Sequence, residues 1–449
     1  MVERALSLSR SDECIVIADE SMSANLRWAN NTLTSNGVSR SNQLTVIAVS
    51  GGATGVVSRD GVTAGDLEDL VRAAEHVASE GMPAEDRNQL VDGRWGDWDA
   101  EPAETSMGVF TRFAGDLAEQ FERAEGDSER LFGFASHDVT TTYAGSSADL
   151  RARHAQPTGH VEMNAKSPDF TKSAWAGVPT EDFTDVDVDG LSAGLSQRLS
   201  WAQRSVDLPA GRYDTILPPG AVADLMIYMY WTADARDALD GRTVFSKPGG
   251  GTRVGERLTT APVALRSDPN ATSVRCAPFV VAHNSGSSQS VFDNGLPVSA
   301  TDWVSGGKLN ALVGSRHSAS LAGLPVTPYV DNLMLEAGGS GSADDLVGRT
   351  TGRALLLTCL WYIREVDPRT LLLTGLTRDG VYLVEGGEVV GAVNNFRFNE
   401  SPVDLLARIT DSGATERTLP REWCDYFTRT AMPALRVEGF NMSTVSQAS

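Results

Sequence analysis

Val291-Phe292-Asp293-Asn294-Gly295 opens the stretch that decides the fold, which runs to Asn399 and holds the densest series of strand, turn and glycine signals in the chain. We interpret the opening as a strand end that runs into a turn, because an Asn-Gly pair tolerates positive φ. Further on, Ser342 predicts a helix N-cap, and Asp344 and Asp345 favour the helix dipole in its first turn. The segment from Gly380 to Val390 contains two β-forming runs around Gly386-Gly387 and predicts a hairpin with one face in a core and the other, with Tyr382, Val384 and Glu388, toward a cavity or water.

The order of these signals resembles the C-terminal region of the TldD/TldE family, whose TldE member is also called PmbA. The resemblance rests on four short motifs in the same order: Phe292-Asp293-Asn294-Gly295, Gly307-Lys308-Leu309, Ser342-Ala343-Asp344-Asp345-Leu346, and the segment from Gly380 to Glu388. No single motif is specific, whereas their order along the chain is.

The length of the chain predicts more than one domain. Its 449 residues are too many for one ordinary core, and 41% hydrophobic with 22% charged residues is typical of a globular protein. The predicted fold class is α+β, with an N-terminal α/β region followed by a large β-rich C-terminal domain. We expect an N-terminal α/β domain at 1–104, a middle α/β domain at 105–216 and a TldD/PmbA-type domain at 217–449.

Charge and hydropathy exclude several classes of partner. The net charge of -21 repels nucleic acid and anionic membranes. The N-terminus lacks the apolar centre of a signal peptide, and the longest apolar run, Ala354 to Ile363, is too short to span a membrane. We therefore expect a cytoplasmic protein, and we expect the tail after Ser443 to be disordered.

Within the first two regions the pattern alternates between strand and helix. The predicted strands are Cys14 to Ala18, Ala24 to Trp28, Leu44 to Val49, Leu131 to Phe134, Val139 to Tyr143 and His160 to Met163. The predicted helices are Ala64 to Ala78, with apolar residues at spacings of three and four, and Ser106 to Glu125. Gly51-Gly52 is read as a hairpin turn, since no Gly-Lys-Ser/Thr follows, and residues 173–204 as a second helical layer.

The apolar run from Gly220 to Trp231 predicts a buried helix whose first turn tolerates the preceding prolines. In the resembled family the TldD-type subunit carries a His-Glu-x-x-x-His zinc motif on this helix. The three motif positions fall here on Ile227, Tyr228 and Thr232, none of which binds zinc as imidazole does. No nearby residue replaces the glutamate base, so the resemblance implies the subunit type that lacks the motif.

Cysteine and histidine positions indicate no other metal site. The four cysteines form no Cys-x-x-Cys pair, and no two histidines have the spacing of a helical zinc face. A cysteine ligand near the C-terminus of TldD-type subunits has only a loose counterpart in Cys424, whose spacing to the strand Pro433 to Val437 differs. We assign no metal role to Cys424 and expect a half-buried thiol beside Trp423.

The resemblance implies the non-catalytic subunit of a heterodimeric zinc metallopeptidase that degrades or processes unfolded peptides. Zinc is expected in a TldD-like partner, with no cofactor, metal ligand or catalytic residue in this chain. The chain would complete a cavity that encloses the peptide, and β-addition would bind peptide backbones with little side-chain preference.

Two readings from other classes stay open. A stand-alone serine-type hydrolase could use Ser246 or Ser285 with His283, although no Gly-x-Ser-x-Gly elbow is present. A homodimeric binding protein without enzymatic role is the second, and a homodimer is also possible for the isolated TldE-like chain.

Overall fold

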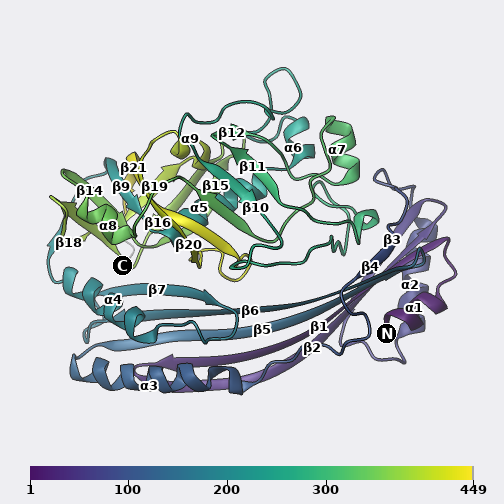
Figure 1. The fold of residues 1–449 in the computed structure, drawn as a ribbon, viewed down its shortest axis with the longest axis horizontal. Coiled ribbons are helices and arrows are strands. Elements are labelled where there is room, and N and C mark those ends of the chain that lie inside the picture. The colour runs from purple at the N-terminus through teal and green to yellow at the C-terminus, as the bar shows by residue number, and fades with distance from the viewer. Residues whose placement is uncertain (447–449) are drawn as a thin grey trace.

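The computed structural model describes residues 1–446, which build two β-sheets with a layer of helices outside the first and a buried helix inside the second (Figure 1). The class is α+β, as the sequence predicts. Within these residues no helix is both long and apolar enough to cross a membrane.

The N-terminal sheet has seven strands in the order β3-β2-β1-β5-β6-β4, with β7 paired to β6. The strands are β1 (Glu13–Ala29), β2 (Thr32–Ser50), β3 (Ala53–Asp60), β4 (Gly93–Trp95), β5 (Arg130–Ser146), β6 (Leu150–Lys166) and β7 (Ser173–Thr180). Because β1 pairs with β5, the regions 1–104 and 105–216 contribute to one sheet. Whether they fold as separate domains stays a prediction.

Four helices and a 3-10 turn accompany this sheet: α1 (Val2–Leu8), α2 (Leu67–Glu80), η1 (Met107–Phe110), α3 (Thr111–Gly126) and α4 (Val188–Trp201). Even-numbered side chains of β1 point toward the helices: Val16 packs with α1 and α2, and Leu26 and Trp28 pack with α3. The odd-numbered face points the other way, where Ile15 and Ile17 pack against Phe292. The C-terminal part therefore covers the face opposite the helices, as Figure 1 shows.

The C-terminal sheet has fourteen strands, most of them short. They are β8 (Ser205–Val206), β9 (Gly211–Leu217), β10 (Ala264–Ser267), β11 (Thr301–Ser305), β12 (Lys308–Leu309), β13 (Leu333–Glu336), β14 (Arg353–Leu357), β15 (Leu360–Asp367), β16 (Leu372–Thr377), β17 (Val381–Glu385), β18 (Glu388–Val393), β19 (Phe396–Glu400), β20 (Ile409–Thr418) and β21 (Thr430–Val445). The accompanying helical turns are α5 (Pro219–Thr232), α6 (Ala235–Leu239), η2 (Val291–Asp293), α7 (Arg316–Ala322), α8 (Ala343–Gly348) and α9 (Pro402–Leu406).

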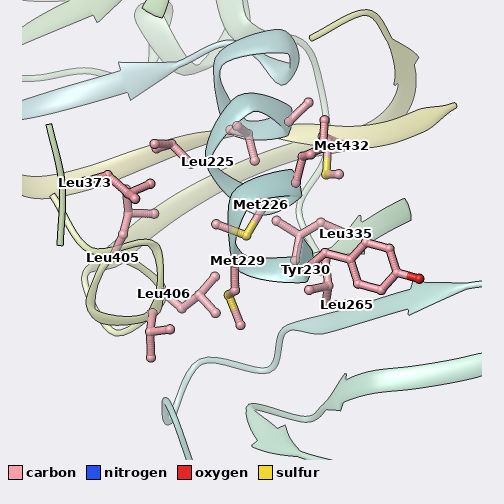
Figure 2. Close-up of a cluster of buried hydrophobic side chains, with 14 of the residues drawn as sticks. Leu225, Met226, Met229, Tyr230, Leu265, Leu335, Leu373, Leu405, Leu406 and Met432 are labelled. Atoms are coloured by element: carbon pink, nitrogen blue, oxygen red, sulfur yellow. The ribbon is translucent and has the colours of Figure 1, made fainter. Parts of the chain in front are cut away.

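Helix α5 is the centre of the C-terminal core, as expected for an apolar run with proline at its first position. Figure 2 shows its side chains among residues from strands and from α9. The labelled members are Leu225, Met226, Met229, Tyr230, Leu265, Leu335, Leu373, Leu405, Leu406 and Met432. A helix that is hydrophobic all round must be enclosed on every side, and the strongly bent sheet supplies that enclosure.

The structure confirms the hairpin and several local predictions. β17 and β18 pair across Gly386-Gly387, β2 and β3 pair across Gly51-Gly52, and Ser342 forms a capping box with Asp345. One detail of the hairpin is wrong: Tyr382 and Val384, predicted to face a cavity or water, are buried together with Leu346 of α8. Helix α8 covers the second face, so the hairpin is buried on both.

Other local predictions need correction. One strand, β1, contains both Cys14 to Ala18 and Ala24 to Trp28. The polar residues between these two segments stay extended because β1 pairs continuously with β2 and β5. Residues 173–204 begin with strand β7, which pairs with β6, before α4 starts. The predicted disorder after Ser443 is wrong for Thr444 and Val445, which pair with β19. Residues 447–449 lie outside the described part.

Candidate functional site

The three residues that the resemblance assigns to the zinc motif lie on the C-terminal half of α5. Ile227 is fully buried, and the Thr232 hydroxyl donates to the carbonyl oxygen of Tyr228 at 2.9 Å. Tyr228 is partly buried. A buried isoleucine, a phenol and a hydroxyl that is already hydrogen-bonded do not provide the imidazole ligands that a zinc ion requires. The residues at this place therefore do not fit a zinc ion.

Aromatic rings surround these positions. The ring of Trp423 lies 5.7 Å from that of Tyr228 and 5.1 Å from that of Trp231, both edge to face. Such pairs stabilise one another beyond the area they bury. Over residues 1–446, no three His, Cys, Asp or Glu side chains come together in a way that could hold a metal ion.

A buried carboxylate, Asp224, fastens the Trp423 segment to α5. Its oxygens accept hydrogen bonds from the backbone N–H groups of Arg421 at 3.2 Å and Glu422 at 2.9 Å. The indole of Trp423 donates to the Asp224 carbonyl oxygen at 2.9 Å. Burial raises the pKa of Asp224 well above its usual range, against the effect of the two N–H donors. We did not single this residue out from the sequence, although a lone carboxylate inside an apolar helix was a usable signal.

Cys424 is buried, whereas we expected a half-buried thiol. Its sulfur lies 3.6 Å from Oε1 of Glu162 on β6, and burial, with Glu162 as a second cause, raises the pKa of the thiol. Glu162 also accepts from Trp175 Nε1 at 3.0 Å and pairs with Arg421 at 2.9 Å. Because the thiolate is the nucleophile and the metal ligand, a raised pKa makes this thiol less reactive than a free one.

A cavity of about 370 Å³ lies between the N-terminal sheet and the C-terminal part. Thr140, Thr142, His154 and Gln156 of β5 and β6 line one side, and Phe279, Val280, Val281, His283, Tyr329 and Asp331 line the other. Burial lowers the pKa of His154 against the effect of its hydrogen bond to Gln156, and nearby arginines act in the same direction as burial, so the neutral imidazole is favoured. The cavity thus combines hydroxyl, amide and carboxylate groups, among them Asp331, with the apolar side chains of Phe279, Val280 and Val281, and such a mixture of apolar and polar groups is usual for a small-ligand or peptide pocket.

The proposed serine and histidine of a hydrolase do not form a dyad. Ser285 donates to Asp86 at 2.6 Å and accepts from the N–H of Val291, while His283 lies 3.4 Å from Asp19 and 3.2 Å from the hydroxyl of Thr45. Ser246 accepts from the N–H of Thr243 in a separate loop. Within residues 1–446 no hydrogen bond joins either serine to His283, so the geometry that activates a nucleophile is missing.

The Phe-Asp-Asn-Gly motif forms the joint between the two sheets. It is a 3-10 turn, η2, rather than the predicted strand end, because Asn294 uses its side chain to bond Ala282 and Val291. Asp293 is almost fully buried and accepts from Arg316 at 2.6 Å through Nε and 2.9 Å through the backbone N–H.

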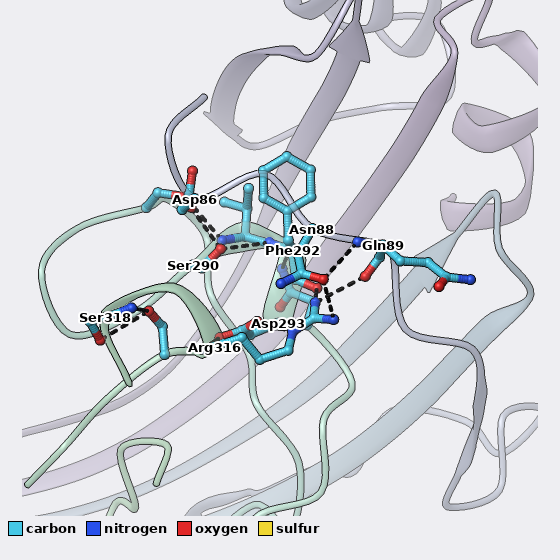
Figure 3. Close-up of polar contacts among 12 residues, drawn as sticks. Asp86, Asn88, Gln89, Ser290, Phe292, Asp293, Arg316 and Ser318 are labelled. Atoms are coloured by element: carbon cyan, nitrogen blue, oxygen red, sulfur yellow. Dashed lines mark hydrogen bonds and ion pairs between the residues drawn. The ribbon is translucent and has the colours of Figure 1, made fainter. Parts of the chain in front are cut away.

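Figure 3 shows that the Arg316 side chain extends from the C-terminal part toward Asn88 and Gln89. Its guanidinium donates to Asn88 Oδ1 at 3.1 Å and to the carbonyl oxygen of Gln89 at 3.0 Å. Ser290 donates to Asp86 at 2.7 Å nearby. Residues of the segment between α2 and β4 are therefore held by the C-terminal part, and this motif, one of the four that carry the resemblance, has a structural role.

The comparisons with known proteins agree with this architecture. The sequence profile described as PmbA/TldA metallopeptidase C-terminal domain matches residues 210–444, and the profile of PmbA/TldA metallopeptidase domain 1 matches residues 16–78. A search of curated protein sequences found no match.

Solved structures share the fold over nearly the whole chain. TldE from Thermococcus kodakarensis has a TM-score of 0.81 at 16% identity, covering 98% of both chains. A candidate modulator of a DNA gyrase from Thermotoga maritima has a TM-score of 0.77 at 16% identity and the same coverage. A candidate modulator of DNA gyrase from Bacteroides thetaiotaomicron has a TM-score of 0.76 at 12% identity, covering 99% of this chain and 98% of that one.

Proposed function

Because the chain belongs to the PmbA/TldD metallopeptidase family, we propose that it is the TldE-type, non-catalytic subunit of a heterodimeric zinc metallopeptidase that processes unfolded peptides in the cytoplasm. The observation that carries the proposal is the chemistry of α5. By the sequence resemblance, Ile227, Tyr228 and Thr232 correspond to the two histidines and the glutamate of a TldD-type subunit, and we find no carboxylate nearby that would replace the glutamate as base. The partner therefore supplies the zinc and the water-activating carboxylate.

The contribution of this chain is to bind and orient the peptide. On one side the cavity is lined by Thr140, Thr142 and Gln156 of the N-terminal sheet. On the opposite side Phe279 and Tyr329 form an apolar wall. Hydroxyl and amide groups can form hydrogen bonds with the backbone of a peptide of any sequence, and aromatic side chains exclude water from these hydrogen bonds. Such a site holds an unfolded segment without selecting strongly for its side chains.

The joint at Asp293 and Arg316 supports this role. The buried ion pair with Asp293 orients Arg316, and the Arg316 guanidinium donates hydrogen bonds to Asn88 and Gln89 of the N-terminal part. The cavity walls come from both parts, so their mutual position has to be fixed for the cavity to keep its shape. We infer that the joint maintains the peptide-binding geometry.

The proposal is tested by mixing the purified chain with a TldD-like partner that carries the His-Glu-x-x-x-His motif. We expect no cleavage of an unfolded peptide by this chain alone, and cleavage by the mixture well above that of the partner alone. A mixture no more active than the partner contradicts the proposal. Cleavage by this chain alone that is lost in Ser285→Ala supports the serine hydrolase instead.

Metal content gives an independent check. After dialysis against a weak chelator, we expect less than stoichiometric zinc in this chain and about one zinc per heterodimer in the complex, since the ligands reside in the partner. One zinc per isolated chain contradicts the assignment of subunit type. The matched control is the double variant Ile227→His/Thr232→His, measured alone, which asks whether the two imidazoles are enough to retain the metal.

A further inference from the structure

A small pocket of about 30 Å³ lies between the N-terminal sheet and the C-terminal part, next to the cavity of about 370 Å³. Thr158 of β6 and Thr180 of β7 line one side of the pocket, and Ser273 and Thr428 from two loops line the other. Gln156 lines both spaces, so the pocket and the cavity are neighbours. A pocket of this size has room for about two water molecules, or for one group as small as a carboxylate.

Three arginines gather at this pocket: Arg275 from a loop, Arg417 of β20 and Arg429 immediately before β21. They come together in a chain that has only 38 basic residues against 59 acidic ones. Arg429 stands between the pocket and the cavity, because its guanidinium pairs with Asp331 of the cavity wall and donates to the hydroxyl of Thr158. Its position is thereby fixed from both sides.

The other two arginines keep donors that no protein group uses. Arg417 donates to Asp185 and to the carbonyl oxygen of Pro179 with Nη2 alone, so within residues 1–446 its Nε and Nη1 have no acceptor. Neither of these two nitrogens is buried, so both are accessible. Arg275 is 62% exposed, and its guanidinium lies 3.7 Å from Glu181, which is too far for a hydrogen bond. The whole fork of Arg275 is therefore free to bind a ligand.

The charge of these arginines reaches the wall of the cavity. Burial is the first cause that lowers the pKa of His154, and a hydrogen bond to Gln156 opposes it. Three arginines, Arg429, Arg153 and Arg275, lower this pKa further. The charges that act on this end of the cavity are thus positive, although the chain as a whole has a net charge of -21.

From these free donors we propose that the pocket binds a carboxylate of the peptide whose chain occupies the neighbouring cavity. The inference rests on the proposed peptide-binding role. A guanidinium holds a carboxylate through parallel N–H donors in a planar fork, which Arg275 offers complete, and Arg417 adds further donors from β20. The carboxylate comes from the C-terminus of the peptide or from an acidic side chain. An anchor of this kind fixes one point of the peptide while its backbone is bound without regard to sequence.

Net charge and the pocket predict opposite preferences. Repulsion from a chain with a net charge of -21 favours the peptide that carries fewer negative charges. The pocket favours the peptide that carries the carboxylate. At physiological salt, repulsion beyond about 8 Å is largely screened, so a preference for the carboxylate has to come from groups that contact it.

Isothermal titration calorimetry of the whole chain with one neutral, unstructured peptide tests the pocket. We expect the C-terminal amide to have a Kd at least about tenfold higher than the free acid, since it loses charge-assisted hydrogen bonds. Arg275→Gln, at an exposed side chain, should weaken binding of the acid several-fold and leave the amide unchanged. The matched control is Arg112→Gln on α3, where an exposed arginine faces Asp116 at 3.6 Å, and it should bind both forms like the wild type.

A third peptide, the amide with one glutamate added, identifies the source of the carboxylate. Binding as tight as that of the free acid assigns the pocket to acidic side chains, and binding like that of the plain amide assigns it to the C-terminus.

The outcomes separate this inference from the proposed function. An amide that binds as tightly as the acid overturns it, and so does a preference for the acid that Arg275→Gln leaves intact. The absence of binding by either form also overturns it. The subunit role is decided by cleavage in the mixture with a TldD-like partner, so cleavage of acid and amide alike by that mixture refutes the pocket and leaves the subunit role standing.

Discussion

The two sheets bury their hydrophobic residues in different ways. The N-terminal sheet uses long, continuously paired strands, hides the even face of β1 beneath helices, and keeps Asp19, Ser21 and Ser23 on the other. The C-terminal sheet uses short strands that bend around α5, and its hairpin is buried on both faces. The second face of the N-terminal sheet is thus buried only in part, around Ile15 and Ile17, and its polar stretch is available to ligands, whereas burial on both faces holds the scaffold rigid. We therefore expect substitutions to cost stability mainly in the C-terminal sheet and at the joint.

The largest effect is expected at the joint itself. Asp293→Ala leaves the Arg316 guanidinium without its buried partner and should lower the free energy of unfolding by about 3 to 5 kcal/mol. Urea titration measures it, with Asp302→Ala, at an exposed aspartate, as the matched control. A loss below about 1 kcal/mol would mean that the two sheets are not fastened here.

A leucine-to-alanine substitution in each sheet tests whether stability depends more on the C-terminal sheet than on the N-terminal one. Leu383→Ala removes a side chain that is 2% exposed and should cost about 2 to 5 kcal/mol. Leu33→Ala, measured at low protein concentration, removes one that is 45% exposed and should change stability by about 0.5 kcal/mol or less. Equal losses in the two variants would contradict the difference drawn between the sheets.

A pH comparison addresses the buried carboxylate of α5. Folding raises the pKa of Asp224, so the protonated carboxyl group is favoured in the native state. The stability that this group contributes is therefore lost as the pH rises from the pKa of Asp224 in the unfolded chain through its higher pKa in the folded chain. Asp224→Asn carries no such dependence. Relative to wild type, the variant should become progressively more stable as the pH rises above about 4, the ordinary pKa of an aspartate. A difference that stays constant over this range would show that Asp224 titrates as it does in the unfolded chain.

The smallest effect is expected at the hairpin turn. Glu385 pairs with Arg353 at 2.9 Å with both side chains about half exposed, and such pairs contribute less than about 1 kcal/mol. Glu385→Ala should therefore leave both stability and the activity of the assembled complex nearly unchanged. If peptide cleavage were abolished while the variant stayed folded, Glu385 would belong to the active cavity instead.

Strong local signals made much of the fold predictable. The periodic apolar face of α2, the capping box at Ser342 and the turn at Gly386-Gly387 each depend on neighbours in sequence, and each is confirmed. The length of β1 was not predictable in the same way. Its middle, from Asp19 to Ser23, is polar, and only pairing with β2 and β5 keeps it extended.

The candidate site was predictable in its chemistry more than in its geometry. The apolar run alone predicts the helix that holds Ile227 and Tyr228, and α5 extends one residue further, to Thr232; the choice of these three positions comes from the family resemblance. Contacts between residues far apart in sequence could not be found that way. The burial of Asp224 under residues 421–423 and the reach of Arg316 to Asn88 depend on how distant segments dock, which no local pattern encodes.

The position of β21 has a consequence for synthesis on the ribosome. This strand pairs with β9, β13, β19 and β20, and its Met432 packs against α5. The nascent chain can complete the N-terminal sheet once β7 has emerged, but α5 must wait for a strand translated near the end. During that interval an almost wholly apolar helix is exposed to solvent, and such intermediates are prone to aggregate. Chaperone binding to nascent chains should therefore begin as α5 leaves the exit tunnel and end when β21 follows.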